Sequence, residues 1–392
     1  MMDSTTESLL FDLSDEQVQI RDALRRYLDK EVAPLVDKYE HEEKLVPMSV
    51  VQRMREFGLL GGMLPAADGG FGLPASTYGM LIAELARTWP SLRSIVSTSN
   101  LAASVISDGG STEMKNQVLP RVLDGQVIAS FALSEPNIGS DAASLETRAS
   151  PVQNGWLVNG RKLYISLGPV CELGVVFVRT GPQASPRNVS CLLFDRSMPG
   201  ITVTSIPKMG MHSCPLGEIL FEDVFIPHEN LIGDEGRGFS LAKKYLNIGR
   251  SVVAFSALGI AQSACDAAVL YAKQRHQFGK PIGSFQLVQQ LVADMLTLVE
   301  TSSLLCYRSA HALDRQSHDA AYFCSMAKRY CTDAVLRVAE MSMQVHGGAG
   351  YTKLFPVERY YRDARHLSIA EGTNQIQAML IASQVLGLSA LR

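Results

Sequence analysis

The chain has 392 residues, which is enough for two or three domains with substantial apolar cores. Apolar residues make up 46% and charged residues 19% of the chain, and its 31 glycines and 17 prolines are scattered, so the composition excludes a disordered or fibrous protein. The formal net charge of −3 lacks the basic excess that a phosphate backbone requires, and we expect no nucleic-acid partner.

The cysteines and the N-terminus indicate the compartment. The seven cysteines are odd in number and form no C-x-x-C pair, which favours a reducing compartment over a disulfide framework or a zinc ribbon. The N-terminal segment MMDSTTESLLFDLSDEQ is acidic and resembles neither a signal peptide nor an Arg-rich transit sequence, so we expect a cytoplasmic protein. The most apolar stretch, residues 251–272, carries Gln262 and Asp266, which favours a bundle helix over a membrane span.

The first 125 residues have a helical pattern. Ser14 and Gln17 form a capping-box sequence, and apolar residues then recur at three- and four-residue spacing. The Gly- and Pro-rich segment 64–76 should separate two helices.

Between residues 152 and 227 the apolar period changes to two, which predicts strands. Asn159 and Gly160 form a dipeptide that is typical of a tight hairpin turn, so we expect strands on both sides of it. Further strands are expected at residues 174–180, 189–196, 201–206 and 218–226. Together they predict a small antiparallel β-barrel or sandwich.

From about residue 238 the helical period returns, with long helices expected at residues 240–275, 285–317, 318–345 and 373–386. Their short connections predict an antiparallel bundle. The fold class is therefore α+β and mainly α, with domains at 1–129 (helical), 130–237 (β) and 238–392 (helical bundle).

The common motifs of other enzyme classes do not occur in the sequence. It has no G-x-G-x-x-G, no P-loop and no G-x-S-x-G elbow. Its eight histidines lack the i, i+4 pairing of a zinc-binding helix, and we expect no metal.

The segment Glu371-Gly372-Thr373 precedes an apolar helix near the C-terminus. Glu371 has two interpretations. It can complement the positive end of that helix beside an N-cap threonine. Alternatively, it is a general base that the permissive Gly372 holds close to backbone N–H groups.

Three other segments also have two interpretations each. FALSEPNIGSD (131–141) is either a domain linker or a polar loop that contacts a heteroaromatic ring or a phosphate. RHQFGKPIGSFQ (275–286) is either an exposed turn or a site for an anionic cofactor. QVHGGAGY (344–351) is either a plain helix C-cap or a backbone that approaches a ligand.

In this order, and within a helix–β–helix layout, these segments resemble the acyl-CoA dehydrogenase family over almost the whole chain. The resemblance implies a three-domain fold with a four-helix C-terminal bundle, usually in a homotetramer (a homodimer being the alternative), with FAD as the cofactor. It also implies a substrate that is an acyl thioester of CoA or of an acyl carrier protein, and an electron-transfer acceptor.

The resemblance assigns roles residue by residue. Glu371 matches the catalytic base, which removes the α-proton while the β-carbon gives hydride to flavin N5. The residues that match substrate contacts are Ser140, Arg93, Asn247, Arg250 and Gly372. The residues that match FAD contacts are Phe131, Leu133, Ser134, Gly139, Ser140, Tyr164, Ser166, Arg275, Gln277, Phe278, Gln286, Gln344, Gly347, Gly348, Thr373 and Gln375. In the family, the contacts that match Arg275 to Gly348 are made largely to the FAD of a neighbouring subunit.

Some positions depart from the family pattern or bear on the substrate. Some relatives carry the base at the position of Gly249, which cannot serve. Ala370 and Leu167 replace residues common in the family and can reshape the acyl pocket. Arg93 matches an arginine that holds the far carboxylate of glutaryl-CoA; the alternative is a surface ion pair.

Two other functions stay open at the sequence level. One is a flavin oxidase or monooxygenase of the same fold. The other is a flavin-free homologue that serves as a scaffold or a carrier-binding module.

Overall fold

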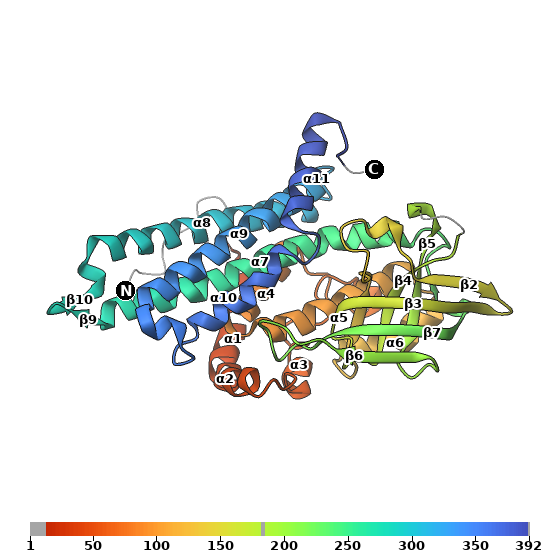
Figure 1. The fold of residues 1–392 in the computed structure, drawn as a ribbon, viewed down its shortest axis with the longest axis horizontal. Helices are drawn as coiled ribbons and strands as arrows, with labels where there is room; N and C mark the ends of the chain where they lie inside the picture. The colour runs from red at the N-terminus through yellow and green to blue at the C-terminus, as the bar shows by residue number, and fades with distance from the viewer. Residues whose placement is uncertain (1–12, 182–184, 391–392) are drawn as a thin grey trace.

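The computed structural model describes residues 13–181 and 185–390. Residues 1–12, which contain most of the acidic N-terminal segment, lie outside the described residues. The long helices of the C-terminal part run along the long axis of the molecule, with the β-sheet at one end and a small hairpin at the other (Figure 1).

Six helices form the N-terminal part: α1 (Asp15–Tyr27), α2 (Ala33–His41), α3 (Met48–Arg53), α4 (Ala75–Thr88), α5 (Pro90–Gly109) and α6 (Thr112–Leu123). The predicted capping box is confirmed, since the Ser14 side chain accepts from the Gln17 N–H at the start of α1. Trp89 is extended because it precedes a proline, and Pro90 then starts α5 at a position that needs no N–H donor. Most residues of α4 and α5 are buried.

The middle part contains β1 (Ala129–Ala132), β2 (Arg148–Val152), β3 (Gly155–Ser166), β4 (Leu173–Arg179), β5 (Val189–Asp195), β6 (Ile201–Ser205), β7 (Leu216–Pro227) and β8 (Leu231–Ile232). They form one sheet in the order β6-β7-β3-β2-β4-β5-β8, with β1 beside β4. The sheet is mixed rather than wholly antiparallel, because β1 and β2 each pair with β4 in parallel. The chain enters β1 from α6, so no tight turn fixes the direction of that strand.

The predicted hairpin at Asn159-Gly160 is wrong. Strand β3 continues through both residues, and the turn before it is at Gln153 and Asn154. Gly160 has φ +148° and lies at a register shift against β7, where an added Cβ would lie 2.6 Å from Thr147 Cα. The glycine therefore serves a bulge with a close backbone approach instead of a turn.

The C-terminal part contains α7 (Gly238–Gln274), α8 (Gln286–Asp314), α9 (Ala320–His346), α10 (Val357–Arg365) and α11 (Asn374–Leu386). The four expected helices are confirmed, and α10 is an additional short helix whose polar sequence VERYYRDAR shows no extended apolar run. Helix α7 is long and apolar enough to cross a membrane, but 72% of its most apolar window is buried inside the protein, as in the core helix of a bundle. Helices α7 and α8 are linked by a hairpin of β9 (His276–Gln277) and β10 (Lys280–Pro281).

One apolar core connects the three parts. It contains residues of α4 and α5, of the inner face of the sheet and of α7, α8 and α9.

Candidate active site

The Glu371 loop connects the 3₁₀ turn His366–Ser368 to α11. Glu371 (φ +57°) and Gly372 (φ +85°) are both left-handed, and the Thr373 side chain caps α11 by accepting from the Ile376 N–H at 3.3 Å. A glutamate in this conformation carries backbone strain that the surroundings must offset. Thr373 is the N-cap, as both interpretations of Glu371 expect, but a charge at the helix end would not require the left-handed conformation of Glu371.

Hydrogen bonds from three side chains hold the backbone of this loop. Arg250 Nε donates to the Glu371 carbonyl at 3.3 Å, and Gln377 Nε2 donates to the carbonyls of Glu371 (3.1 Å) and Gly372 (2.8 Å). Buried Lys328 of α9 donates to the Ser368 and Gly372 carbonyls at 3.1 and 2.9 Å. The loop is thus fixed by its carbonyls, which leaves the Glu371 carboxyl free for another role.

The Glu371 carboxyl lies against α7. A Cβ added at Gly249 would be 3.0 Å from both Cδ and Oε2 of Glu371. The residue at 249 must therefore be small for Glu371 to occupy this position.

The Glu371 carboxyl is buried and has an unsatisfied oxygen. Among the described residues, Oε2 has no hydrogen-bond partner. Burial raises the pKa of Glu371 above its ordinary value, and the charges of Arg250, Lys328 and Arg93 oppose this rise. A carboxylate with a raised pKa and a free oxygen is suited to accept a proton.

Arg93 of α5 is buried, with 4% of its surface exposed. Its Nε and Nη2 have no hydrogen-bond partner among the described residues, and Nη1 makes one long contact of 3.4 Å with Ser97 Oγ. Burial lowers the pKa of Arg93 to about 10, which still leaves it charged at neutral pH. Arg93 is therefore a buried cation without a counter-ion in hydrogen-bond contact, which excludes the surface ion pair.

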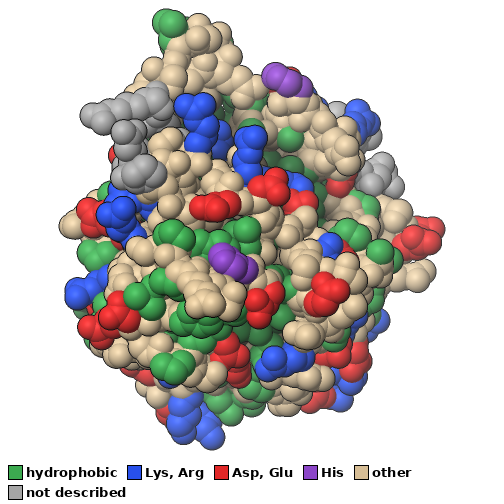
Figure 2. Space-filling model, turned by 90° about the vertical axis from the view of Figure 1, so that its right-hand side faces the viewer, with side chains coloured by type: hydrophobic (Ala, Val, Ile, Leu, Met, Phe, Trp, Pro, Cys, Tyr) green, Lys and Arg blue, Asp and Glu red, His purple; other side chains and the backbone are tan. Residues whose placement is uncertain are grey.

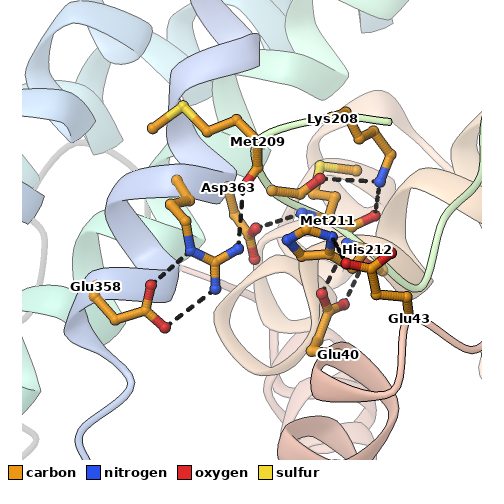
Figure 3. Close-up of polar contacts among 11 residues, drawn as sticks. Glu40, Glu43, Lys208, Met209, Met211, His212, Glu358 and Asp363 are labelled. Carbon is orange, nitrogen blue, oxygen red and sulfur yellow. Dashed lines mark hydrogen bonds and ion pairs between the residues drawn. The ribbon is translucent and has the colours of Figure 1, made fainter. Parts of the chain in front are cut away.

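A cluster of polar residues from α2, from α10 and from the loop between β6 and β7 joins the three parts of the chain (Figure 3). Glu40 of α2 accepts from the His212 N–H at 2.8 Å, and Asp363 of α10 accepts from the Met211 N–H at 2.6 Å. Lys208 donates to the Met211 carbonyl. Burial and the charge of Glu40 raise the pKa of Asp363 to about 7. The cluster fixes the loop between β6 and β7 against the two helical parts, and no pattern in the sequence predicted it.

The first group of predicted FAD residues includes residues of β1, of the loop that follows it and of β3, an interior strand of the sheet. Phe131 of β1 packs on Phe177, and the Ser134 carbonyl accepts from the Leu163 N–H at 2.9 Å, which places the loop after β1 beside β3. Tyr164 is 63% exposed and has φ +59°. A Cβ added at Gly139 would meet open space. The loop thus has an open backbone at Gly139, and it contacts β3 next to the exposed ring of Tyr164.

The second group lies at the opposite end of the bundle. Arg275, Gln277, Phe278 and Gln286 surround the β9–β10 hairpin, far from the sheet (Figure 1). Tyr271, which accepts from the Arg275 N–H, stacks on His346 at 4.3 Å, so the Gln344–Gly348 turn lies at the same end. Phe278 is 91% exposed. A single chain therefore does not bring the two groups together.

Sequence reasoning missed the residues that support the site. These are Lys328, Gln377, Asn374, Glu135 and Lys162. The only signal was a lysine inside an apolar pattern: Lys162 at an inward position of a strand and Lys328 within a helix. A buried lysine needs partners, but the sequence does not show which they are.

Three family models match the chain: the acyl-CoA dehydrogenase N-terminal domain at residues 14–126, the middle domain at 130–224 and the C-terminal domain at 236–386. The chain belongs to the acyl-CoA dehydrogenase family. An acyl-CoA dehydrogenase of Bacillus subtilis is 36% identical over 377 residues, covering 96% of this chain and 99% of that protein. The caffeyl-CoA reductase-Etf complex subunit CarC of Acetobacterium woodii is 35% identical over 375 residues, covering 95% and 99%.

Solved structures of acyl-CoA dehydrogenases and related proteins have the same fold. A glutaryl-coenzyme A dehydrogenase with glutaryl-CoA superposes with a TM-score of 0.93 at 32% identity, covering 97% of this chain and 98% of that one. The protein PigA with FAD and proline gives 0.92 at 27% identity, covering 96% and 99%. The prolyl acyl carrier protein oxidase AnaB gives 0.90 at 27% identity, covering 96% and 100%.

Acyl-CoA dehydrogenases are FAD-dependent oxidoreductases, and the residues of this member are compatible with a bound FAD. The loop after β1, with open space at Gly139, lies beside exposed Tyr164 on β3, and the free Glu371 oxygen lies over α7. The face at the sheet end of the molecule carries acidic and basic side chains in a mixed pattern (Figure 2).

Proposed function

We propose that this acyl-CoA dehydrogenase family member oxidises an acyl thioester between its α- and β-carbons, with Glu371 as the general base. The observation that carries the proposal is Oε2 of Glu371, which is buried without a partner on a loop whose carbonyls are held by other side chains. An unpaired buried carboxylate oxygen is costly, so a proton-accepting role gives a physical reason for it.

Glu371 takes the α-proton of the bound thioester and becomes a carboxylic acid. Its raised pKa increases its strength as a base, and the charges of Arg250 and Lys328 keep it ionised before the reaction. Negative charge develops on the thioester carbonyl, and we assign the backbone N–H of Glu371 as one of the donors that stabilise it. FAD, when bound, supplies the acceptor for the hydride that leaves the β-carbon, and the product is a 2,3-enoyl thioester.

The FAD contacts divide between two places on the chain. The loop Phe131–Ser140, together with Tyr164, Ser166, Thr373 and Gln375, would hold the flavin ring. The distal group from Arg275 to Gly348 would hold the diphosphate and adenosine of FAD in a neighbouring subunit. This division is supported by the position of the two groups at opposite ends of the bundle (Figure 1), and it requires an oligomer, for which we propose a homotetramer.

The acyl group that we propose ends in a carboxylate. Among the described residues, Arg93 is buried and has two guanidinium nitrogens without a partner, and its charge opposes the rise in the Glu371 pKa. Planar, two-pronged donors match a carboxylate, and a buried cation needs an anion. The similarity to glutaryl-coenzyme A dehydrogenase supports this substrate class.

The carrier of the acyl group is CoA or an acyl carrier protein, and Asn247 and Arg250 would contact its arm. Arg250 Nη1 donates to Asn247 Oδ1 at 2.5 Å, so the two side chains form one polar unit beside Glu371. We further propose an electron-transferring flavoprotein as the electron acceptor and the cytoplasm as the location. The relative CarC, named as part of an Etf complex, supports the acceptor.

The test is anaerobic bleaching of the flavin absorbance by glutaryl, succinyl and butyryl thioesters of CoA and of an acyl carrier protein. Wild type should bleach, and Glu371→Gln should keep its FAD but bleach at least 1,000-fold more slowly, because the amide cannot accept the proton. Glu340→Gln, which alters an exposed carboxylate of α9, is the control. Bleaching of Glu371→Gln at the wild-type rate would place the base elsewhere, and a colourless wild type would indicate a scaffold protein.

A further inference from the structure

Lys162 of β3 and Glu135 form an ion pair inside the middle part of the chain. Lys162 Nζ is 2.7 Å from Glu135 Oε1, and the side chains are 0% and 1% exposed. Lys162 also donates to the Leu133 carbonyl at 3.1 Å. A pair that is so completely removed from water is costly, and apolar residues of the same volume often give an equally stable protein. Stability alone therefore does not explain its presence.

The Glu135 carboxylate also accepts hydrogen bonds from the backbone. Its carboxylate accepts from the N–H groups of Glu146 at 2.6 Å and Thr147 at 3.0 Å. Its own N–H and carbonyl exchange hydrogen bonds with Ile138 at 2.9 and 3.2 Å, which closes a tight turn. One carboxylate thus connects both ends of the loop 133–147 to Lys162.

Within β3, Lys162 lies at the point where the register of this strand against β7 changes. The register against β7 shifts between Lys162 and Ile165, and within this shift Tyr164 has φ +59° and faces outward. The next residue after Lys162, Leu163, donates its N–H to the Ser134 carbonyl at 2.9 Å. The ion pair therefore lies directly behind the contact between the loop and the exposed part of β3.

We propose that the Lys162–Glu135 pair positions the loop 133–141 against β3, so that Ser134 and Tyr164 form one preset surface for the FAD ring. Both residues act through the backbone and do not touch the cofactor. Directional bonds from one ammonium to Leu133 and Glu135 fix the register of the loop, which apolar packing would leave less defined. The inference rests on the proposed function, in which this loop and β3 bind the flavin.

The test measures FAD affinity of the apoprotein by the quenching of flavin fluorescence. Lys162→Met and Glu135→Asp should each bind FAD at least tenfold more weakly than wild type, while circular dichroism shows an unchanged fold. The Asp variant keeps the charge but is one methylene too short to reach Lys162 and both amides. The control is Arg161→Met, which breaks the neighbouring, half-exposed pair with Glu218 (2.8 Å) and should change affinity less than twofold.

A double variant separates positioning from stability. Lys162→Met/Glu135→Gln removes both charges, so the apoprotein should regain part of the melting temperature lost in Lys162→Met, yet its FAD affinity should stay low because the bond to Leu133 is still missing. Recovery of both quantities, or wild-type affinity in both single variants, would overturn the proposal. A wild type that binds FAD but oxidises no acyl thioester would contradict the proposed function and leave this test valid.

Discussion

Replacing Arg93 with alanine tests whether the substrate carries a carboxylate. Arg93 is buried in α5 with two free guanidinium nitrogens, and in the described structure it makes no ion pair. Because none of the described residues is a carboxylate partner that would be left unpaired, the loss in Arg93→Ala should appear in the complex with an anionic substrate. The free enzyme should unfold no more easily than expected from the lost packing of the side chain.

The magnitude follows from the burial of the contact. Truncating one member of a buried, hydrogen-bonded charge pair costs about 2–5 kcal/mol, which corresponds to a loss of about 30- to 5,000-fold in kcat/KM. A second effect acts on every substrate alike: the charge of Arg93 lowers the pKa of Glu371, so its removal raises that pKa. The ratio between two substrates cancels this common effect and isolates the carboxylate contact.

The assay compares kcat/KM for glutaryl, succinyl and butyryl thioesters in wild type, Arg93→Ala and Arg93→Lys. The dicarboxylic substrates should lose far more than butyryl, and Lys should recover little because an ammonium does not reproduce a two-pronged contact. Arg87→Ala, which removes a partly exposed pair with Asp266 (3.1 Å), is the control. An equal change for all three substrates would refute the reasoning.

Three further predictions concern the base, the polar cluster and the distal group. Gly249→Ala places a Cβ 3.0 Å from the Glu371 carboxyl, so anaerobic single-turnover bleaching should slow by about 10- to 100-fold with FAD content unchanged; an unchanged rate would contradict the contact. The raised pKa of Asp363, about 7, means that its contribution to stability is present below about pH 4 and is lost as pH rises to 7. Asp363→Asn, which keeps the acceptor for Met211, should remove up to about 4 kcal/mol of this pH dependence in urea unfolding, and an unchanged profile would exclude Asp363 as its source. Arg275→Ala should weaken FAD retention and the oligomer together, as measured by absorbance and gel filtration, and full retention in dilute solution would argue against a contact between subunits.

The sequence predicted the elements that have long, regular periods. Helices α7, α8 and α9 follow the apolar pattern because they pack side by side in a bundle. Strand β7 follows an alternating pattern, whereas β4 and β5 are apolar runs that are buried along almost their whole length. The Asn159-Gly160 hairpin failed because a dipeptide that permits a turn also permits a bulge, and the choice depends on the distant Thr147 that packs on Gly160.

The chemistry of the site was harder to predict than its location. Glu371 was singled out by its place before an N-cap threonine and matched to the catalytic base by the family resemblance, but the loop backbone that positions it is held by Arg250, Lys328 and Gln377. These partners come from α7, α9 and α11, and no local pattern indicates that they converge. The same holds for Lys162, whose partner Glu135 lies 27 residues earlier in the chain.

Glu371 and Arg93 are two buried charged groups whose burial costs free energy, and the substrate gives a reason for keeping both. In the part of the chain that the structure describes, each has buried polar atoms without a partner, and although their charges are opposite the two side chains form no ion pair. A stable resting protein would pair them, because a buried charge without a partner costs free energy. Their separation has a physical reason if the missing partners belong to the substrate: a proton at its α-carbon for Glu371 and a carboxylate at its far end for Arg93.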